Sequence, residues 1–225
     1  MTLINALASQ VRRDVILASR EGGGALQSVF FYAVFVGLAG FAAGPEASTL
    51  LIAGPGMVWL AIIIAMQLAA TGLFRPDLED GTLSIMRAEQ GALWPYVAGR
   101  VIALLLTVAV PMIALTPIAW LMFAAEPGDS VRGTIMVVTA MPAIILSSIV
   151  AAGLSAGLGA GGVIGTILAA PLAIPIVIFG LRAQESWALS GQFFSPDCML
   201  LLAVSLVYLV VMPPFAVLSI RTALE

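Results

Sequence analysis

Long apolar stretches without charged residues divide this chain into segments that can cross a membrane. A transmembrane helix needs about 20 predominantly apolar residues, and charged side chains at the bilayer centre are costly. The gaps between charged residues therefore predict six spans, at approximately residues 25–43, 50–73, 97–123, 134–156, 163–181 and 199–220. A glycine-rich run at residues 157–162 lets the chain turn between the fourth and fifth spans. This pattern predicts an all-α membrane protein with a single transmembrane domain over residues 1–225.

The composition excludes a soluble globular domain. Of the 225 residues, 61% are hydrophobic and 9% are charged, against about 45–50% and about 25% in average soluble domains. The chain contains no lysine and no histidine, which excludes a Walker A phosphate loop, histidine-based catalysis and histidine metal ligands. The single cysteine, Cys198, cannot form an intramolecular disulfide or a cysteine-cluster metal site. We therefore expect no catalytic residues, no metal site and no nucleic-acid partner.

The placement of arginine predicts the orientation in the membrane. Cytoplasmic loops of membrane proteins carry an excess of basic residues. With the N-terminus in the cytoplasm, the outside segments hold only Arg132 and Arg182. The inside segments then hold the other seven arginines, which are Arg12, Arg13, Arg20, Arg75, Arg87, Arg100 and Arg221. We expect both termini to be cytoplasmic.

The first 20 residues have the pattern of an amphipathic helix. Apolar side chains recur every four residues, at Leu3, Leu7, Val11 and Val15. Two basic residues, Arg12 and Arg13, lie beside this stripe. Such a helix is suited to lie in the membrane interface. Two interpretations stay open: an elbow helix that transmits motion into the first span, or a simple interfacial anchor and topology signal.

The longest predicted cytoplasmic loop, residues 74–99, contains an acidic cluster. It comprises Asp77, Leu78, Glu79, Asp80, Gly81, Thr82 and Leu83. Catalysis is disfavoured because no histidine or lysine accompanies these carboxylates. One interpretation is a solvated acidic turn that leads into a short helix, with Gly81 ending or bending it. The other is a docking element for another protein's basic groove, with Leu78 and Leu83 as anchors and the carboxylates orienting the contact.

Glycine and proline mark a second group of candidate positions in the predicted fourth and fifth spans. Glycines recur at four-residue spacing at Gly153, Gly157, Gly161 and Gly165, which permits close helix contact. Pro171 and Pro175 interrupt the fifth span, where they act as hinges or as tolerated kinks in a static bundle. We expect the glycines to serve packing.

Several motifs resemble those of a known family. An N-terminal amphipathic helix, six spans and an Asp-Gly-Thr-Leu stretch at residues 80–83 resemble the membrane subunits of ABC-type exporters. The chain is more specifically similar to the CcmB family (haem exporter protein B), the membrane subunit of the ABC complex for cytochrome c maturation. The matching stretches are Gly44-Pro45-Glu46, Pro55-Gly56 with Trp59, residues 73–83, and residues 161–179, which include Pro-Leu-Ala-Ile-Pro-Ile-Val-Ile-Phe at 171–179.

The resemblance implies a non-catalytic permease subunit, multi-pass in a bacterial inner membrane. Implied partners are a second copy of the chain, two copies of an ABC ATPase subunit that binds ATP, a haem-handling membrane subunit and a periplasmic haem chaperone. Haem would be a transported or handled ligand rather than a bound cofactor, since without histidine its ligands could come only from Met, Cys198, Tyr or a carboxylate. The alternatives are an exporter permease for another substrate, such as a lipid or drug, and a non-transporting membrane scaffold.

Overall fold

The computed structural model describes residues 24–88, 92–156 and 162–224. The predicted interfacial helix at residues 1–20 therefore lies outside the described residues, as do Gly157 and Gly161. Within these ranges every regular element is a helix. The elements are α2 (Gly24–Ala43), α3 (Ala47–Ala70), α4 (Arg75–Glu79), α5 (Thr82–Ala88), α6 (Leu93–Leu104), the π-helix η1 (Leu105–Ala109), α7 (Val110–Met122), α8 (Pro127–Ala156), α9 (Gly162–Ser190) and α10 (Pro196–Ala223).

Six helical segments of the described chain are long and apolar enough to cross a membrane. They are Gly24–Ala43, Ala47–Glu79, Leu93–Met122, Pro127–Ala156, Pro171–Ser190 and Pro196–Ala223. The predicted fold class, an all-α protein with six membrane-crossing helices, is confirmed. One boundary differs: α9 continues past residue 181 and across Glu185, because the helix ends only where Gly191 adopts a φ of +68°.

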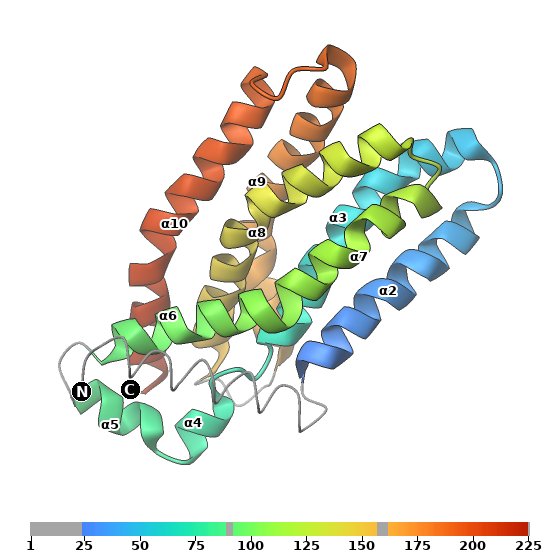
Figure 1. Cartoon of the computed structure of the whole chain (residues 1–225). Coiled ribbons are helices and arrows are strands. Elements are labelled where there is room, and N and C mark those ends of the chain that lie inside the picture. Colours follow the sequence, from blue (N-terminus) through green and yellow to red (C-terminus); the bar gives the residue numbers. More distant parts are fainter. Residues whose placement is uncertain (1–23, 89–91, 157–161, 225) are drawn as a thin grey trace.

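Helix α8 forms the centre of the bundle. In its most apolar stretch, 78% of the residues are buried, against 17–44% in the other five spans. Helices α3, α7, α9 and α10 all pack against α8, and α2 closes the ring between α3 and α7 (Figure 1). Small residues allow the large aromatic side chains into this core: Trp120 lies against Gly133 and Trp59 lies against Gly180. Both tryptophans are therefore packing residues, buried to 1% exposure or less.

The predicted packing glycines can be followed in part. Gly153 of α8 faces α10 so closely that a Cβ atom would overlap the side chain of Ser219. Gly165, Pro171 and Pro175 all lie inside α9, so neither proline ends that helix. Glycine at position 153 thus lets α8 and α10 pack closely, because no side chain at this position separates them.

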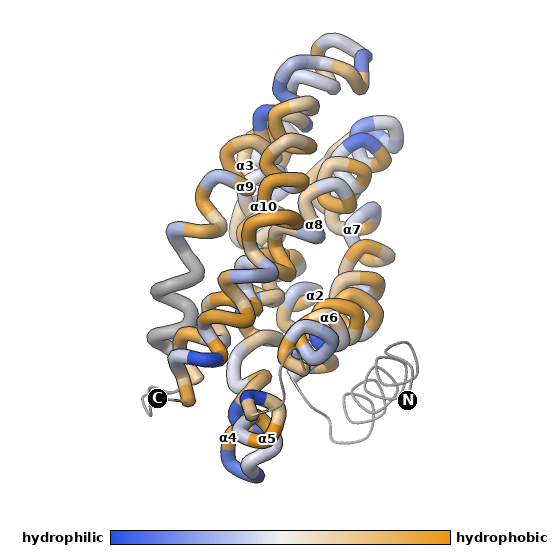
Figure 2. The backbone as a smooth tube through the Cα atoms, turned by 90° about the vertical axis from the view of Figure 1, so that its left-hand side faces the viewer, coloured by the Kyte–Doolittle hydropathy of each residue, from blue (hydrophilic) through white to orange (hydrophobic). Residues whose placement is uncertain are grey.

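The two ends of the bundle differ in chemistry. Helices α4 and α5 lie outside the bundle at one end, together with the start of α2 and the end of α10 (Figure 1). Figure 2 shows the spans as mostly hydrophobic, with hydrophilic segments at the two ends and in α4 and α5. Because the spans alternate in direction, four of the described arginines belong to the α4–α5 end and two to the opposite end: Arg75, Arg87, Arg100 and Arg221, against Arg132 and Arg182.

Candidate functional site

The acidic cluster folds into two short helices joined by a glycine turn. Pro76 stands in the first turn of α4, where its missing N–H leaves no partner unsatisfied. Gly81 then adopts a φ of +79°, which favours glycine and separates α4 from α5. The N–H of Thr82 donates to Oδ1 of Asp80 at 2.9 Å and so starts α5. The prediction that Gly81 ends the first helix is confirmed.

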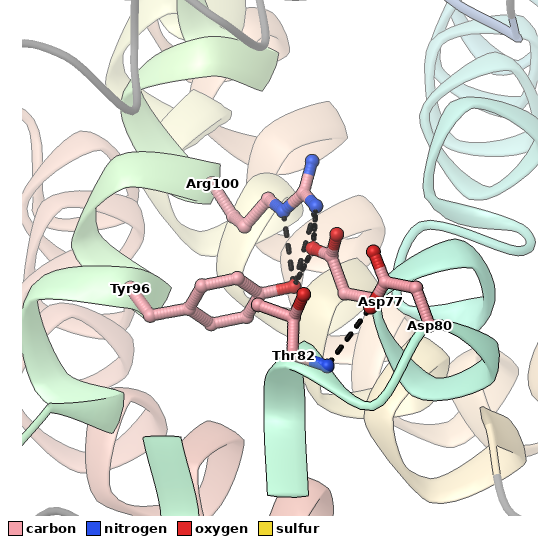
Figure 3. Close-up of polar contacts among 5 residues, drawn as sticks. All are labelled: Asp77, Asp80, Thr82, Tyr96 and Arg100. Atoms are coloured by element: carbon pink, nitrogen blue, oxygen red, sulfur yellow. Dashed lines mark hydrogen bonds and ion pairs between the residues drawn. The ribbon is translucent and has the colours of Figure 1, made fainter. Parts of the chain in front are cut away.

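Asp77 faces into the protein. Its residue exposure is 1%, and its Oδ2 atom accepts a hydrogen bond from the Tyr96 hydroxyl at 2.6 Å. The same oxygen forms an ion pair with Nη2 of Arg100 (Figure 3). Both partners belong to α6, so this carboxylate joins the short α4 to the beginning of the third span.

Tyr96 and Arg100 lie one turn apart on α6 and support each other. The Nε and Nη2 atoms of Arg100 both donate to the Tyr96 oxygen at 3.3 Å. The Arg100 guanidinium also stands over the Tyr96 ring, 5.2 Å from its centroid. Phe74 packs against Tyr96, with 6.0 Å between ring centroids. Both ends of the ion pair are enclosed, since the side chains of Arg100 and Asp77 are 11% and 1% exposed.

The burial of this cluster determines how strongly it holds α4. Removing one member of a buried ion pair costs about 3–5 kcal/mol, because the other charge is left without compensation. An exposed pair is worth about 0–1 kcal/mol. The nearby pair of Arg75 and Glu79, with Nε to Oε1 at 2.8 Å, belongs to the second kind because its side chains are 67% and 65% exposed. Asp77 is therefore the carboxylate of this segment that stabilises the fold.

The opposite side of α4 and α5 faces outward. Glu79, Asp80, Ser84 and Ile85 are exposed, and Ile85 retains 72% of its accessible surface. At the end of α5, Nη1 of Arg87 donates to the backbone oxygen of Leu224 at 3.0 Å. The two short helices are thus attached to α6 through Asp77 and to the end of α10 through Arg87. They expose the carboxylates of Glu79 and Asp80 beside Arg75 and Arg87, with one large apolar side chain, Ile85.

Nearly the whole chain matches a known protein family. The sequence profile described as "CcmB protein" matches residues 5–223. The chain belongs to the CcmB protein family. A relative named "Heme exporter protein B", from Bradyrhizobium diazoefficiens, is 32% identical over 222 residues, which is 99% of this chain and 100% of the relative. With the six apolar helices, this membership establishes a multi-pass membrane protein.

Other CcmB relatives match about half of the chain. The Heme exporter protein B of Pseudomonas aeruginosa is 31% identical over 123 residues, which cover 52% of this chain and 53% of the relative. That of Escherichia coli K12 is 28% identical over 105 residues, which cover 47% and 48%. These identities are low enough that individual residue roles have to be argued from this structure.

The structure divides the predicted docking residues of this CcmB protein into two groups. Asp77 and Leu83 are each 1% exposed and contact their own chain, so these two side chains are covered in this structure. Leu78 is half-buried against the core, which leaves it partly accessible. Glu79 and Asp80 face outward as a docking role requires. The alternative of a fully solvated acidic turn is wrong for Asp77.

Sequence reasoning missed Tyr96 and Arg100 as members of the site. A signal was present: an arginine at the head of an apolar span requires a counter-charge, and an acidic cluster precedes it in the same loop. Among the described residues, no group of three or more Cys, Asp or Glu side chains has a geometry that could hold a metal ion. Within the described part of the chain, the α4–α5 end therefore offers a contact surface and a buried polar link to the third span.

Proposed function

We propose that this CcmB protein is the transmembrane subunit of an ABC transporter complex for cytochrome c biogenesis in a bacterial inner membrane. In this role it couples ATP hydrolysis by a separate ATPase subunit to haem delivery or to release of a haem-loaded periplasmic chaperone. Family membership and the printed name of its relatives support the haem-export system. The observation that carries the coupling role is the pair of short helices, α4 and α5, held outside one end of the bundle with the carboxylates of Glu79 and Asp80 exposed.

The contact with the ATPase would use the outward side of these helices. Glu79 and Asp80 are exposed carboxylates that can orient a basic groove, and Ile85, 72% exposed, can anchor in an apolar pocket. One protein can move another only through an interaction that differs between its states. A surface attached to the bundle at two points suits this task. The full complex would hold two ATPases, a second copy of this chain, a haem-handling membrane subunit and a periplasmic chaperone.

The proposed orientation places α4, α5 and both termini in the cytoplasm. The α4–α5 end carries four of the six described arginines, in agreement with the positive-inside rule. The ATPase would therefore dock from the cytoplasm. The interval between α7 and α8 and that between α9 and α10 would face the periplasm.

Haem handling by this chain is proposed to be mechanical rather than by a tight haem site. A cavity of about 420 Å³ opens between α3, α7, α8 and α9 at the end opposite to α4. Its described lining includes the carboxylates of Asp129 and Glu185, and one guanidinium, Arg132, already paired with Asp129 at 2.6 Å. This charge balance disfavours the two carboxylates of haem, and the chain has no histidine to ligate its iron.

A pair of matched double variants tests the proposed function. Glu79→Lys with Asp80→Asn raises the charge of the exposed face by three and keeps an oxygen at position 80 for the bond to Thr82. The control, Glu46→Lys with Glu126→Gln, makes the same charge change on exposed residues of the opposite end.

We expect the first variant to insert into the membrane normally but to lose ATPase co-purification and cytochrome c assembly. The control should retain both. Normal cytochrome c in cells that lack this chain altogether would favour the alternative of a permease for another substrate. Normal cytochrome c and unchanged ATPase binding in the first variant would refute the docking surface.

A further inference from the structure

We propose that Asp77, Tyr96 and Arg100 are positioning residues that carry the displacement of α4 into the third span, and that this span bends at η1. The proposal rests on the proposed function, since it assumes that a partner displaces α4. It assigns a role to the inward side of the site, whereas docking concerns the outward side. Figure 3 shows the two halves: Asp77 meets α6, while Asp80 turns toward Thr82.

The first step is that α4 depends on this cluster for its position. A helix of five residues is too short to be stable by itself, so contacts with the rest of the protein must hold it. In α4, Asp77 is the buried residue, and its carboxylate is bonded to Tyr96 and Arg100 of α6. A force on α4 therefore acts on α6 directly.

The second step is that the link resists separation. The Asp77 carboxylate and the Arg100 guanidinium are both enclosed, and pulling them apart breaks a pairing between two buried charges. Tyr96 adds a hydrogen bond of 2.6 Å to the same carboxylate oxygen and braces the guanidinium from the side. Moving α4 and α6 together keeps every one of these contacts. The lower-energy response to a displaced α4 is thus a displaced α6.

The third step is that the third span has a place to bend. It consists of two α-helical halves, α6 and α7, joined by the five-residue π-helix Leu105–Ala109. Pro111, the second residue of α7, lacks an N–H and cannot complete the regular hydrogen-bond ladder across this turn. Such π-turns are departures from the regular ladder at which helices bend.

The fourth step is that the far half of the span is fixed. Trp120 of α7 is 1% exposed and lies so close to Gly133 of α8 that a Cβ atom there would be 2.7 Å from Cε2. This contact holds α7 against the central helix, while α6 carries the link to α4. Movement at the α4 end would therefore turn α6 about η1 and leave α7 in place.

Three substitutions at the link test this role in the assembled complex. Arg100→Gln removes the charge, Tyr96→Phe removes one hydrogen bond, and Arg100→Lys keeps the charge that pairs with Asp77. We expect Arg100→Gln to lower cytochrome c maturation at least tenfold while the ATPase subunit co-purifies at the wild-type ratio. Tyr96→Phe should have a smaller effect, and Arg100→Lys should restore a large part of the activity.

A distance measurement reads the movement itself. In a Cys198→Ser background, spin labels at Trp94→Cys on α6 and Val138→Cys on α8 should change separation when ATP is added to the complex. Labels at Leu121→Cys on α7 and Val138→Cys should not. All three labelled positions are accessible: the exposed fractions of Trp94, Val138 and Leu121 are 48%, 47% and 50%. Arg100→Gln should abolish the ATP-dependent change at α6.

The outcomes separate this inference from the proposed function. If the wild-type chain neither binds the ATPase nor supports cytochrome c maturation, the proposed function fails. If Arg100→Gln matures cytochrome c normally and retains the α6 movement, the link is not needed and the inference fails. ATPase binding and maturation could also fall together in Arg100→Gln and Tyr96→Phe and return only together in Arg100→Lys. In that case the cluster only supports the docking face, and the inference also fails.

Discussion

Replacing Asp77 with alanine removes the carboxylate that pairs with the buried Arg100 guanidinium. The Arg100 side chain is 11% exposed in the ion pair, so water compensates it poorly. Removing one partner of such a pair costs about 3–5 kcal/mol. Tyr96 would also lose the Asp77 oxygen that accepts its hydrogen bond at 2.6 Å. A hydrogen bond to a charged group is worth about 1.5–3 kcal/mol. This contribution is part of the loss for the ion pair and does not add to it, because the three side chains form one network.

A double-mutant cycle measures this contribution. The free energy of unfolding in mixed micelles is measured for the purified wild-type protein, for Asp77→Ala, for Arg100→Met and for the double variant. We expect Asp77→Ala to lose about 3 kcal/mol or more, and the double variant to lose less than the sum of the single losses, because both charges of the pair are removed together. Glu79→Ala, which breaks the exposed pair with Arg75, should change stability by less than about 1 kcal/mol. A loss below about 1 kcal/mol for Asp77→Ala would refute the reasoning.

Three further predictions concern packing, topology and chemistry. Gly180→Ala places a Cβ atom 2.5 Å from Cη2 of Trp59 and should destabilise the protein by about 1–3 kcal/mol in the same assay, whereas Gly56→Ala, with no atom within 4 Å, should not. Reporter fusions after Ser84 should indicate cytoplasm and those after Gly128 periplasm, and the reverse pattern would overturn the orientation. The purified chain should hydrolyse no ATP above a detergent blank, because it has no phosphate loop; activity that survives rigorous removal of other subunits would contradict this.

The spans were predictable because the membrane imposes a simple rule on the sequence. Charged residues separate the crossing segments, so the gaps between them, with the longest divided at the glycine run, located six helices. Gly81 could likewise be assigned to a helix break, because glycine tolerates the positive φ that ends a helix. In the structure its φ is +79°. The end of α9 was misplaced because Glu185 lies near the end of the bundle, where a charge does not stop a helix.

The inward and outward carboxylates could not be separated by sequence alone. Helix α4 is little more than one turn long, so no periodicity distinguishes Asp77 from Glu79 or Asp80. The partners of Asp77, Tyr96 and Arg100, follow 19 and 23 residues later on another helix. Their meeting depends on how α4 folds back against α6, which is a property of tertiary packing.

The proposed contact between the outward side of α4 and α5 and an ATPase subunit can be measured directly. The method is site-specific photo-crosslinking in membranes that contain the assembled complex, with the photoreactive residue at Ile85 and, as a control, at Leu189 of α9 near the opposite end. Both side chains are accessible, at 72% and 82% exposure. We expect a cross-link from position 85 to a subunit that carries a Walker A motif, identified by mass spectrometry, and none from position 189. A Walker A subunit cross-linked from position 189 but not from position 85 would contradict docking at α4 and α5.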